Sequence, residues 1–195
     1  LSVTSIQKEF FYGWEQLKEV EIHGAISSLD MIFKDNKCLT KLTCGSNNVL
    51  SLFYHYTKYE TSATDSTITE TGGDNFYVVK HKPNSGSYVY YYLIPNNLTE
   101  VHLLNDIESY CFYNMTSLKK VYLPNDITTF GQGAFAGCSG LTNVYFSTDS
   151  DWKYEISYYT TTDTGIVSKS DMNNSITLAN QLKAHNGYDC YWKKV

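Results

Sequence analysis

The sequence has 195 residues, of which 42% are apolar and 18% are charged, so we expect one or two domains with a packed core rather than a disordered chain. The net charge is −5, with 15 Lys and Arg against 20 Asp and Glu and no basic run, which argues against nucleic acid or an anionic membrane surface as a partner. No apolar stretch approaches the length of a membrane span, so we expect no membrane insertion by this segment.

The cysteines and the first residues bear on disulfide formation, metal binding and processing of the chain. Five cysteines are an odd number with no C-x-x-C pair, which indicates neither a disulfide framework nor a zinc site. The chain begins at Leu1 without a charged and apolar leader, and it remains open whether a leader was removed or the chain is part of a longer protein.

Two segments far apart in the sequence share one apolar pattern. They are "IQKEFFYGWEQLKEVEI" from Ile6 and "IESYCFYNMTSLKKVYL" from Ile107. The same spacing fits "FKDNKCLTKLTC", the second half of "IPNNLTEVHL", and "FGQGAFAGCSGLTNVYF". Equivalent leucines recur after 22 residues (Leu17 to Leu39), 20 residues (Leu98 to Leu118) and 23 residues (Leu118 to Leu141). Such a period is typical of a repeat protein.

The repeated L-x-x-V-x-L pattern predicts one short strand in each repeat, because alternate residues of a strand point to the same side. A single coil cannot bury its own apolar face, but stacked coils form a continuous core. We therefore expect parallel strands near 19–23, 41–45, 100–104, 120–123 and 143–147, with 41–45 beside 100–104. Phe11, Phe33, Phe112 and Phe135 should form one column of that core.

The segments "AFAGCSGLTNVYF" and "CFYNMTSLKKVYLPNDI" resemble the BspA-type leucine-rich repeats. Residues 1–44 and 94–147, about half of the chain, carry this resemblance. It implies an α/β fold, a right-handed leucine-rich-repeat solenoid with short parallel strands on one side and irregular or short helical segments on the other. It also implies an extracellular or cell-surface protein that binds or adheres and is not an enzyme.

Residues 45–93 interrupt the array, within a solenoid that spans 1–147. Two β-rich runs flank the turn-like segment 82–86, which predicts a β-hairpin inserted into the solenoid. Its second strand contains Tyr88, Tyr90, Tyr91 and Tyr92. This hairpin either packs over the coil edge or forms an alternative binding surface, and the tyrosines could make it part of a glycan-binding accessory domain.

Residues 148–195 follow the last repeat, and we interpret them as a C-terminal capping segment, with a separate small binding module as the alternative. Aromatic residues suited to covering the exposed end of the core are Trp152, Tyr188, Tyr191 and Trp192.

The sequence contains little that indicates catalysis. Gly131, Gly133 and Ala136 formally fit the dinucleotide fingerprint G-x-G-x-x-A, but a new strand is expected by Leu141, where that fingerprint needs a helix. No two of the five histidines have a metal-binding helical spacing, and no hydrolase or phosphate-loop motif is present. We therefore expect no catalytic residue, no metal and no cofactor. Cys44, Cys111 and Cys138 fall in repeat columns and should be buried, whereas Cys38 and Cys190 lie outside them and could be exposed.

The candidate binding surface is the concave face of the strands, where residues between the core columns point outward. Its central row is Glu21, Thr43, His102, Tyr122 and Tyr145. Its neighbouring row is Glu19, Lys41, Glu100, Lys120 and Asn143. We call these two rows the strand strip. Charged and aromatic groups together suit contact with a protein or a glycan, whose identity the sequence does not give. The alternative is a structural spacer or assembly module without a ligand on this segment.

Overall fold

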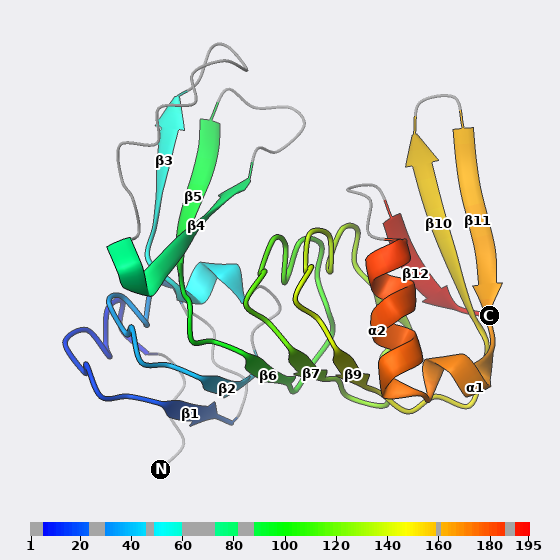
Figure 1. The fold of residues 1–195 in the computed structure, drawn as a ribbon, viewed down its shortest axis with the longest axis horizontal. Helices are drawn as coiled ribbons and strands as arrows, with labels where there is room; N and C mark the ends of the chain where they lie inside the picture. Colours follow the sequence, from blue (N-terminus) through cyan, green and yellow to red (C-terminus); the bar gives the residue numbers. More distant parts are fainter. Residues whose placement is uncertain are drawn as a thin grey trace.

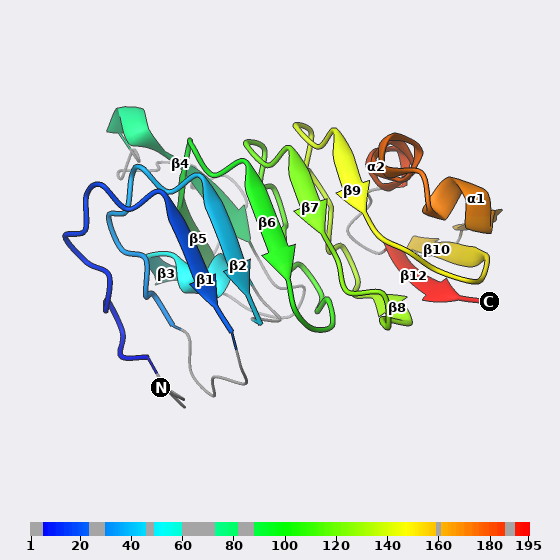
Figure 2. The same ribbon diagram turned by 90° about the horizontal axis from the view of Figure 1, so that it is seen from below.

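The computed structural model of the chain describes residues 6–23, 30–45, 49–59, 73–81, 88–158, 161–185 and 190–195. Five short strands form one parallel sheet in the order β1-β2-β6-β7-β9 (Figures 1 and 2). Their bounds are β1 Glu19–Ile22, β2 Lys41–Cys44, β6 Glu100–Leu103, β7 Lys120–Tyr122 and β9 Asn143–Tyr145. These are the five predicted strands, and β2 lies beside β6 as expected. The predicted leucine-rich-repeat solenoid is confirmed.

The inward columns of the strands form the core that the repeat pattern predicts. Val101, Val121 and Val144 are aligned across the sheet and are fully buried. The leucines that precede the strands behave in the same way, since Leu118 and Leu141 have no exposed surface. Like side chains therefore stack from coil to coil, and burial of this apolar surface stabilises the array.

Four of the five coils, those of Leu17, Leu39, Leu118 and Leu141, each contain two residues in the left-handed backbone region. They lie eight and four residues before the repeat leucine, with φ between 50° and 81°. The first set is Glu9, Met31, Tyr110 and Gly133, and the second is Gly13, Asp35, Asn114 and Gly137. L-residues avoid this region, so its recurrence shows that the fold dictates the bends. The mixed residue types explain why the sequence pattern did not reveal these positions.

The phenylalanine column extends into the third coil, which supplies a ring from outside the recognised repeats. Phe53 follows the short helix η1 (Leu50–Leu52) and lies 5.8 Å from Phe33, which stacks on Phe11 at 5.3 Å. The backbone agrees, since the amide of Phe33 donates to the carbonyl of Leu52. Residues 49–53 therefore form part of a third coil, and further strands follow them before the coil resumes.

Those strands form a three-stranded antiparallel sheet, ordered β3-β5-β4, that rises from the side of the coils opposite the solenoid sheet (Figure 1). The strands are β3 His55–Tyr59, β4 Phe76–His81 and β5 Tyr88–Pro95, with helix η2 (Gly73–Asn75) before β4. The two runs predicted as a hairpin are β4 and β5, and their connection lies outside the described residues. Strand β3 was not predicted, because "HYTKY" is short and its partner is distant in sequence.

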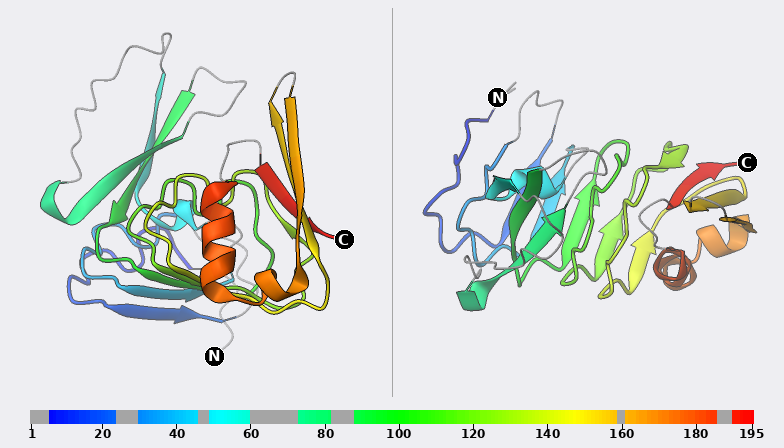
Figure 3. Two further views of the ribbon diagram at one scale, coloured as in Figure 1. Left: turned by 45° about the vertical axis from the view of Figure 1, so that its right-hand side comes forward. Right: turned by 90° about the horizontal axis from the view of Figure 1, so that it is seen from above.

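The chain after β9 adds two helices and three strands, which form with the earlier strand β8 a second antiparallel sheet, ordered β11-β10-β12-β8 (Figure 3). Its elements are β8 Thr129–Phe130, β10 Trp152–Tyr158, β11 Thr161–Val167, β12 Cys190–Lys194, α1 Lys169–Met172 and α2 Ser175–Ala184. Trp152 and Trp192 are buried, with ring centroids 4.7 and 6.4 Å from that of Phe130. Tyr188 lies outside the described residues. Cys190, named above with Cys38 as a cysteine that could be exposed, is buried, because β12 pairs with both β10 and β8.

Inter-coil hydrogen bonds recur three residues before the repeat leucine. The Asn36 amide donates to the carbonyl of Phe11 in the preceding coil, at 2.9 Å. At the equivalent position three coils further along, the Cys138 thiol donates to the carbonyl of Phe112, at 3.0 Å. The cysteine of the A-F-x-x-C pattern is thus a buried hydrogen-bond donor as well as a small core residue.

Candidate functional site

The register of the parallel sheet aligns the two rows of the strand strip. Glu19, Lys41, Glu100, Lys120 and Asn143 are consecutive partners across the sheet. Glu21, Thr43, His102, Tyr122 and Tyr145 form the second such series. Exposure varies along the strip: Thr43 is buried at 6%, whereas Tyr145 is 37% exposed and Glu19, Glu21 and Lys120 are exposed as well. The strand period places both rows on the outer face of the sheet, opposite the valine column.

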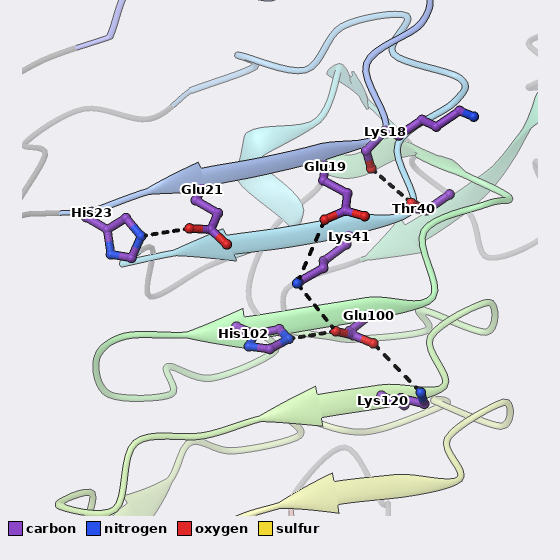
Figure 4. A network of polar contacts seen from close by, with 9 residues as sticks. All are labelled: Lys18, Glu19, Glu21, His23, Thr40, Lys41, Glu100, His102 and Lys120. Atoms are coloured by element: carbon purple, nitrogen blue, oxygen red, sulfur yellow. Dashed lines mark hydrogen bonds and ion pairs between the residues drawn. The ribbon is translucent and has the colours of Figure 1, made fainter.

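Opposite charges alternate along the first row (Figure 4). The Lys41 ammonium lies 3.9 Å from the Glu19 carboxylate and 4.0 Å from that of Glu100. Glu100 also lies 3.9 Å from the Lys120 ammonium and 2.7 Å from Nε2 of His102. Exposed ion pairs each contribute at most about 1 kcal/mol, so the main consequence of this network is orientation of the side chains. Glu100 is its centre and joins the charged row to the aromatic row.

Three rings are stacked along the second row. The His102 and Tyr122 centroids are 4.0 Å apart with planes 16° from parallel, and those of Tyr122 and Tyr145 are 4.3 Å apart with planes 13° from parallel. Burial, the Glu100 carboxylate and Tyr145 raise the pKa of Tyr122. Both tyrosines are outside the core columns, so these large groups are available for contact in a fixed orientation.

A hollow of about 330 Å³ lies at the end of the ring stack, between the solenoid sheet and the junction of α1 and α2. It is lined by Tyr122, Leu123, Asn125, Tyr145, Phe146, Ser147, Asn173 and Ser175. The Asn143 amide donates to the Ser175 hydroxyl at 3.1 Å, which connects the strip to α2. The Asn125 carbonyl oxygen accepts from the backbone amide of Ser147 at 3.2 Å. Sequence reasoning missed this hollow, because no local pattern places residues 173–175 beside Tyr145.

A second, polar hollow of about 540 Å³ shares Asn125, Ser147 and Asn173 with the first. Its charged residues are Asp149, Lys169 and Lys194. Lys194 forms an ion pair with Asp149, and this pairing lowers the carboxyl pKa of Asp149. The strand strip therefore continues past its aromatic end into further polar surface.

The alternative tyrosine surface on β5 is smaller than the sequence suggests. Tyr91 and Tyr92 are buried, Tyr90 is half-buried, and only Tyr88 is largely exposed, at 56%. Alternate residues of β5 are turned toward different neighbours, and the Lys80 ammonium lies over the Tyr91 ring at 5.7 Å. The sheet also packs on the coils through His81, whose ring lies near Tyr110. The four tyrosines of β5 therefore do not form a surface of four exposed rings.

Residues 131–136, which formally match the dinucleotide fingerprint, form part of a repeat coil. Gly133 adopts a φ of 60° at one of the recurring left-handed positions, and Ala134 and Phe135 are buried in the core. Among the residues that the structure describes, no group of three or more His, Cys, Asp or Glu could hold a metal ion. No helix in the same part of the chain is both long and apolar enough to cross a membrane.

The stacked coils, the parallel sheet and the columns of like side chains define a leucine-rich-repeat solenoid. The family model described as BspA type leucine rich repeat region matches residues 1–82 and 84–184 with six copies, so the chain belongs to the BspA-type leucine-rich-repeat family. Comparisons with curated proteins and with solved structures give no match. Leucine-rich-repeat domains are generally non-enzymatic scaffolds that mediate protein binding, and those of this family are often associated with the cell surface.

Proposed function

We propose that this chain is a non-enzymatic binding or adhesion module of a bacterial cell-surface or secreted protein, and that the strand strip contacts a host protein or glycan. The stacked rings of His102, Tyr122 and Tyr145 are the observation that carries this proposal. In this arrangement residues 1–147 form the solenoid, interrupted at about 45–93, and residues 148–195 cap its C-terminal end.

The stack is suited to binding because its geometry exists before any partner arrives. Aromatic side chains offer large contact areas at a low cost in side-chain entropy, and tyrosine is enriched among the residues that dominate binding energy. Each ring is held by its neighbour at 4.0 or 4.3 Å, so little further ordering is needed on association. The adjoining charges of Glu100 and Lys120 would favour partners with complementary charge.

The test begins with a screen of immobilised host matrix proteins and glycans. For a confirmed ligand, the double variant Tyr122→Ala and Tyr145→Ala should weaken binding by at least about 1–2 kcal/mol. The fold should persist, because neither ring fills a core column, and circular dichroism and thermal unfolding will check this. Unchanged affinity in a folded double variant would contradict the proposal.

Two controls separate the strand strip from the β5 surface. Tyr88→Ala removes a tyrosine of β5 that is more exposed than Tyr145, and it should leave affinity unchanged. Deleting residues 61–75, the polar part of the insertion, should also spare binding. Loss of binding in these controls, with the strip variants intact, would transfer the site to the inserted sheet.

The charged row gives an independent kinetic test. Glu100→Gln removes the carboxylate that faces Lys41, Lys120 and His102 while keeping nearly the same shape. If the row orients a charged partner, the variant should change the association rate and its dependence on salt more than the dissociation rate. A salt dependence identical to that of the parent would remove the charged row from the binding surface.

A structural or assembly module is the second candidate, and one observation favours it. At the β1 end of the solenoid, Phe10, Tyr12 and Trp14 are each more than half exposed. Exposed aromatic clusters of this kind often mark interaction surfaces. Sedimentation velocity should then show self-association that increases with concentration and is abolished by Phe10→Ser and Trp14→Ser together. If the protein stays monomeric at all concentrations, the result would count against the assembly module and favour the binding module.

A further inference from the structure

The strand strip is chemically divided along its length. Its β1 end contains Glu19, Glu21 and Lys41, and its centre contains Glu100 and Lys120. Its β9 end is different, because the side chains that line the hollow beside Tyr145 are aromatic, apolar, amide or hydroxyl groups without formal charge. A ligand that sits in this hollow must therefore be recognised by shape and neutral hydrogen bonds rather than by ion pairing.

The ring stack ends at this hollow. Tyr122 has a ring on each side, His102 and Tyr145, whereas the stack described in the structure has no ring beyond Tyr145. Tyr145 is also the more exposed of the two tyrosines and lines the hollow. A flat, partly apolar group placed there would continue the stack by one step.

The polar lining can serve a ligand rich in hydroxyl groups. The Asn125 carbonyl oxygen is engaged by the amide of Ser147, which fixes the side chain and leaves its two Nδ2 donors. The Ser175 hydroxyl accepts from Asn143 and retains its own proton for donation. Asn173 contributes differently, because its amide bonds to the carbonyls of Thr148 and Lys169 and so fixes the wall of the hollow.

We propose that the β9 end of the strand strip is a saccharide subsite, in which one pyranose ring of an uncharged glycan packs on Tyr145 and bonds to Asn125 and Ser175. This inference rests on the proposed binding function and specifies its ligand class. A pyranose has a C–H face that packs on an aromatic ring and a rim of hydroxyls that donate and accept hydrogen bonds.

The volumes of the two hollows agree with one sugar unit at the ring stack and a following unit of the same glycan beyond it. The hollow of about 330 Å³ is at the lower end of the roughly 300–1,000 Å³ range of small-molecule sites. The adjoining hollow of about 540 Å³ offers polar surface for a following unit. Its Lys194 and Asp149 are paired with each other, and Lys169 is the further charged residue of that hollow.

The test uses saturation-transfer NMR on the whole chain with a panel of neutral oligosaccharides, namely cellotetraose, maltotetraose, laminaritetraose, lactotetraose and triacetylchitotriose. At least one should receive saturation on the C–H protons of a single ring, at sugar concentrations up to about 10 mM. Absence of transfer to every member of the panel would overturn the inference.

Matched variants locate the binding. Tyr145→Ala should weaken the active saccharide by at least about tenfold, whereas Tyr145→Phe should retain most of the affinity, since the ring provides the platform. Asn125→Asp keeps the acceptor for Ser147 but removes the Nδ2 donors, and should weaken binding by about fivefold or more. Tyr88→Ala should bind as the parent does. Equal binding by a folded Tyr145→Ala variant would overturn the inference.

The outcome is separable from that of the proposed function. If a protein ligand loses affinity on replacement of Tyr122 and Glu100 while no saccharide binds, the strand strip is a binding surface but the saccharide subsite is wrong. If the Tyr122→Ala and Tyr145→Ala double variant binds every confirmed ligand as the parent does, both proposals fail.

Discussion

The rings of Phe33 and Phe53 lie 5.8 Å apart, in adjacent coils, and both side chains are buried. Phe53 thereby extends the phenylalanine column to the coil from which the three-stranded sheet leaves the solenoid. The backbone amide of Phe33 donates to the carbonyl of Leu52 at 2.9 Å, which holds the two coils in register. The core is therefore continuous across the insertion, and this continuity leads to the first prediction.

Phe112→Ala and Phe53→Ala should each lower the free energy of unfolding by about 3–5 kcal/mol, because each would leave a cavity between stacked coils. Urea unfolding followed by circular dichroism measures this. Phe10→Ala is the matched control. Because Phe10 is 54% exposed, this substitution should lower the free energy of unfolding far less. An unchanged unfolding midpoint in Phe112→Ala would contradict the assigned column.

Gly137→Ala should destabilise the protein more than Gly13→Ala. Both glycines occupy the recurring left-handed position, at φ 74° and 81°, so both variants carry a backbone cost of about 1–2 kcal/mol. A Cβ at Gly13 would meet nothing within 4 Å, whereas one at Gly137 would overlap the Asn114 side chain. The difference between the two unfolding free energies measures how tightly neighbouring coils pack. Equal losses would show that the backbone cost alone matters.

Cys111, Cys138 and Cys44 should resist thiol reagents at pH 8 until the chain unfolds. Burial raises the pKa of Cys138 to about 12 and that of Cys111 well above its usual range, which suppresses the reactive thiolate. Cys190, with a pKa raised by burial to about 11, should also react slowly. Cys38 is only partly buried and should be labelled first. Rapid labelling of all five thiols in the native protein would refute this assignment.

Stability should fall as the pH is lowered from 7.5 to 5. Burial lowers the pKa of His81, which lies against Tyr110 and Tyr113 at 4.6 and 5.3 Å, and burial also lowers the pKa of His185. The unfolded chain then binds protons more readily than the folded chain, so protonation below the ordinary histidine pKa of 6.5 favours unfolding.

His81→Phe should reduce this pH dependence, because phenylalanine keeps an aromatic ring against the two tyrosines and cannot be protonated. Urea titrations of parent and variant at both pH values measure the effect, and pH 5 is still above the ordinary carboxyl range. Lys80→Met serves as the control, because it changes the neighbouring residue and leaves His81 in place. A pH dependence as steep in His81→Phe as in the parent would exclude His81 as its source.

The sequence by itself determined the five strands, their order and the two rows of the strand strip. It could do so because the apolar pattern recurs after 20–23 residues wherever the array is uninterrupted, and because a strand alternates its side chains. The repeats aligned in sequence are therefore also aligned in space. Glu100 beside Lys120 and Tyr122 beside Tyr145 follow from that register alone.

The tertiary structure determined the features that the repeat pattern does not specify. Phe53 extends the core column only because the third coil is divided, and β3 exists only because β5 pairs with it. The hollow beside Tyr145 depends on α2, which reaches β9 from more than thirty residues further along the chain. Such contacts depend on the packing of segments without a shared pattern, and burial rather than local sequence selects them.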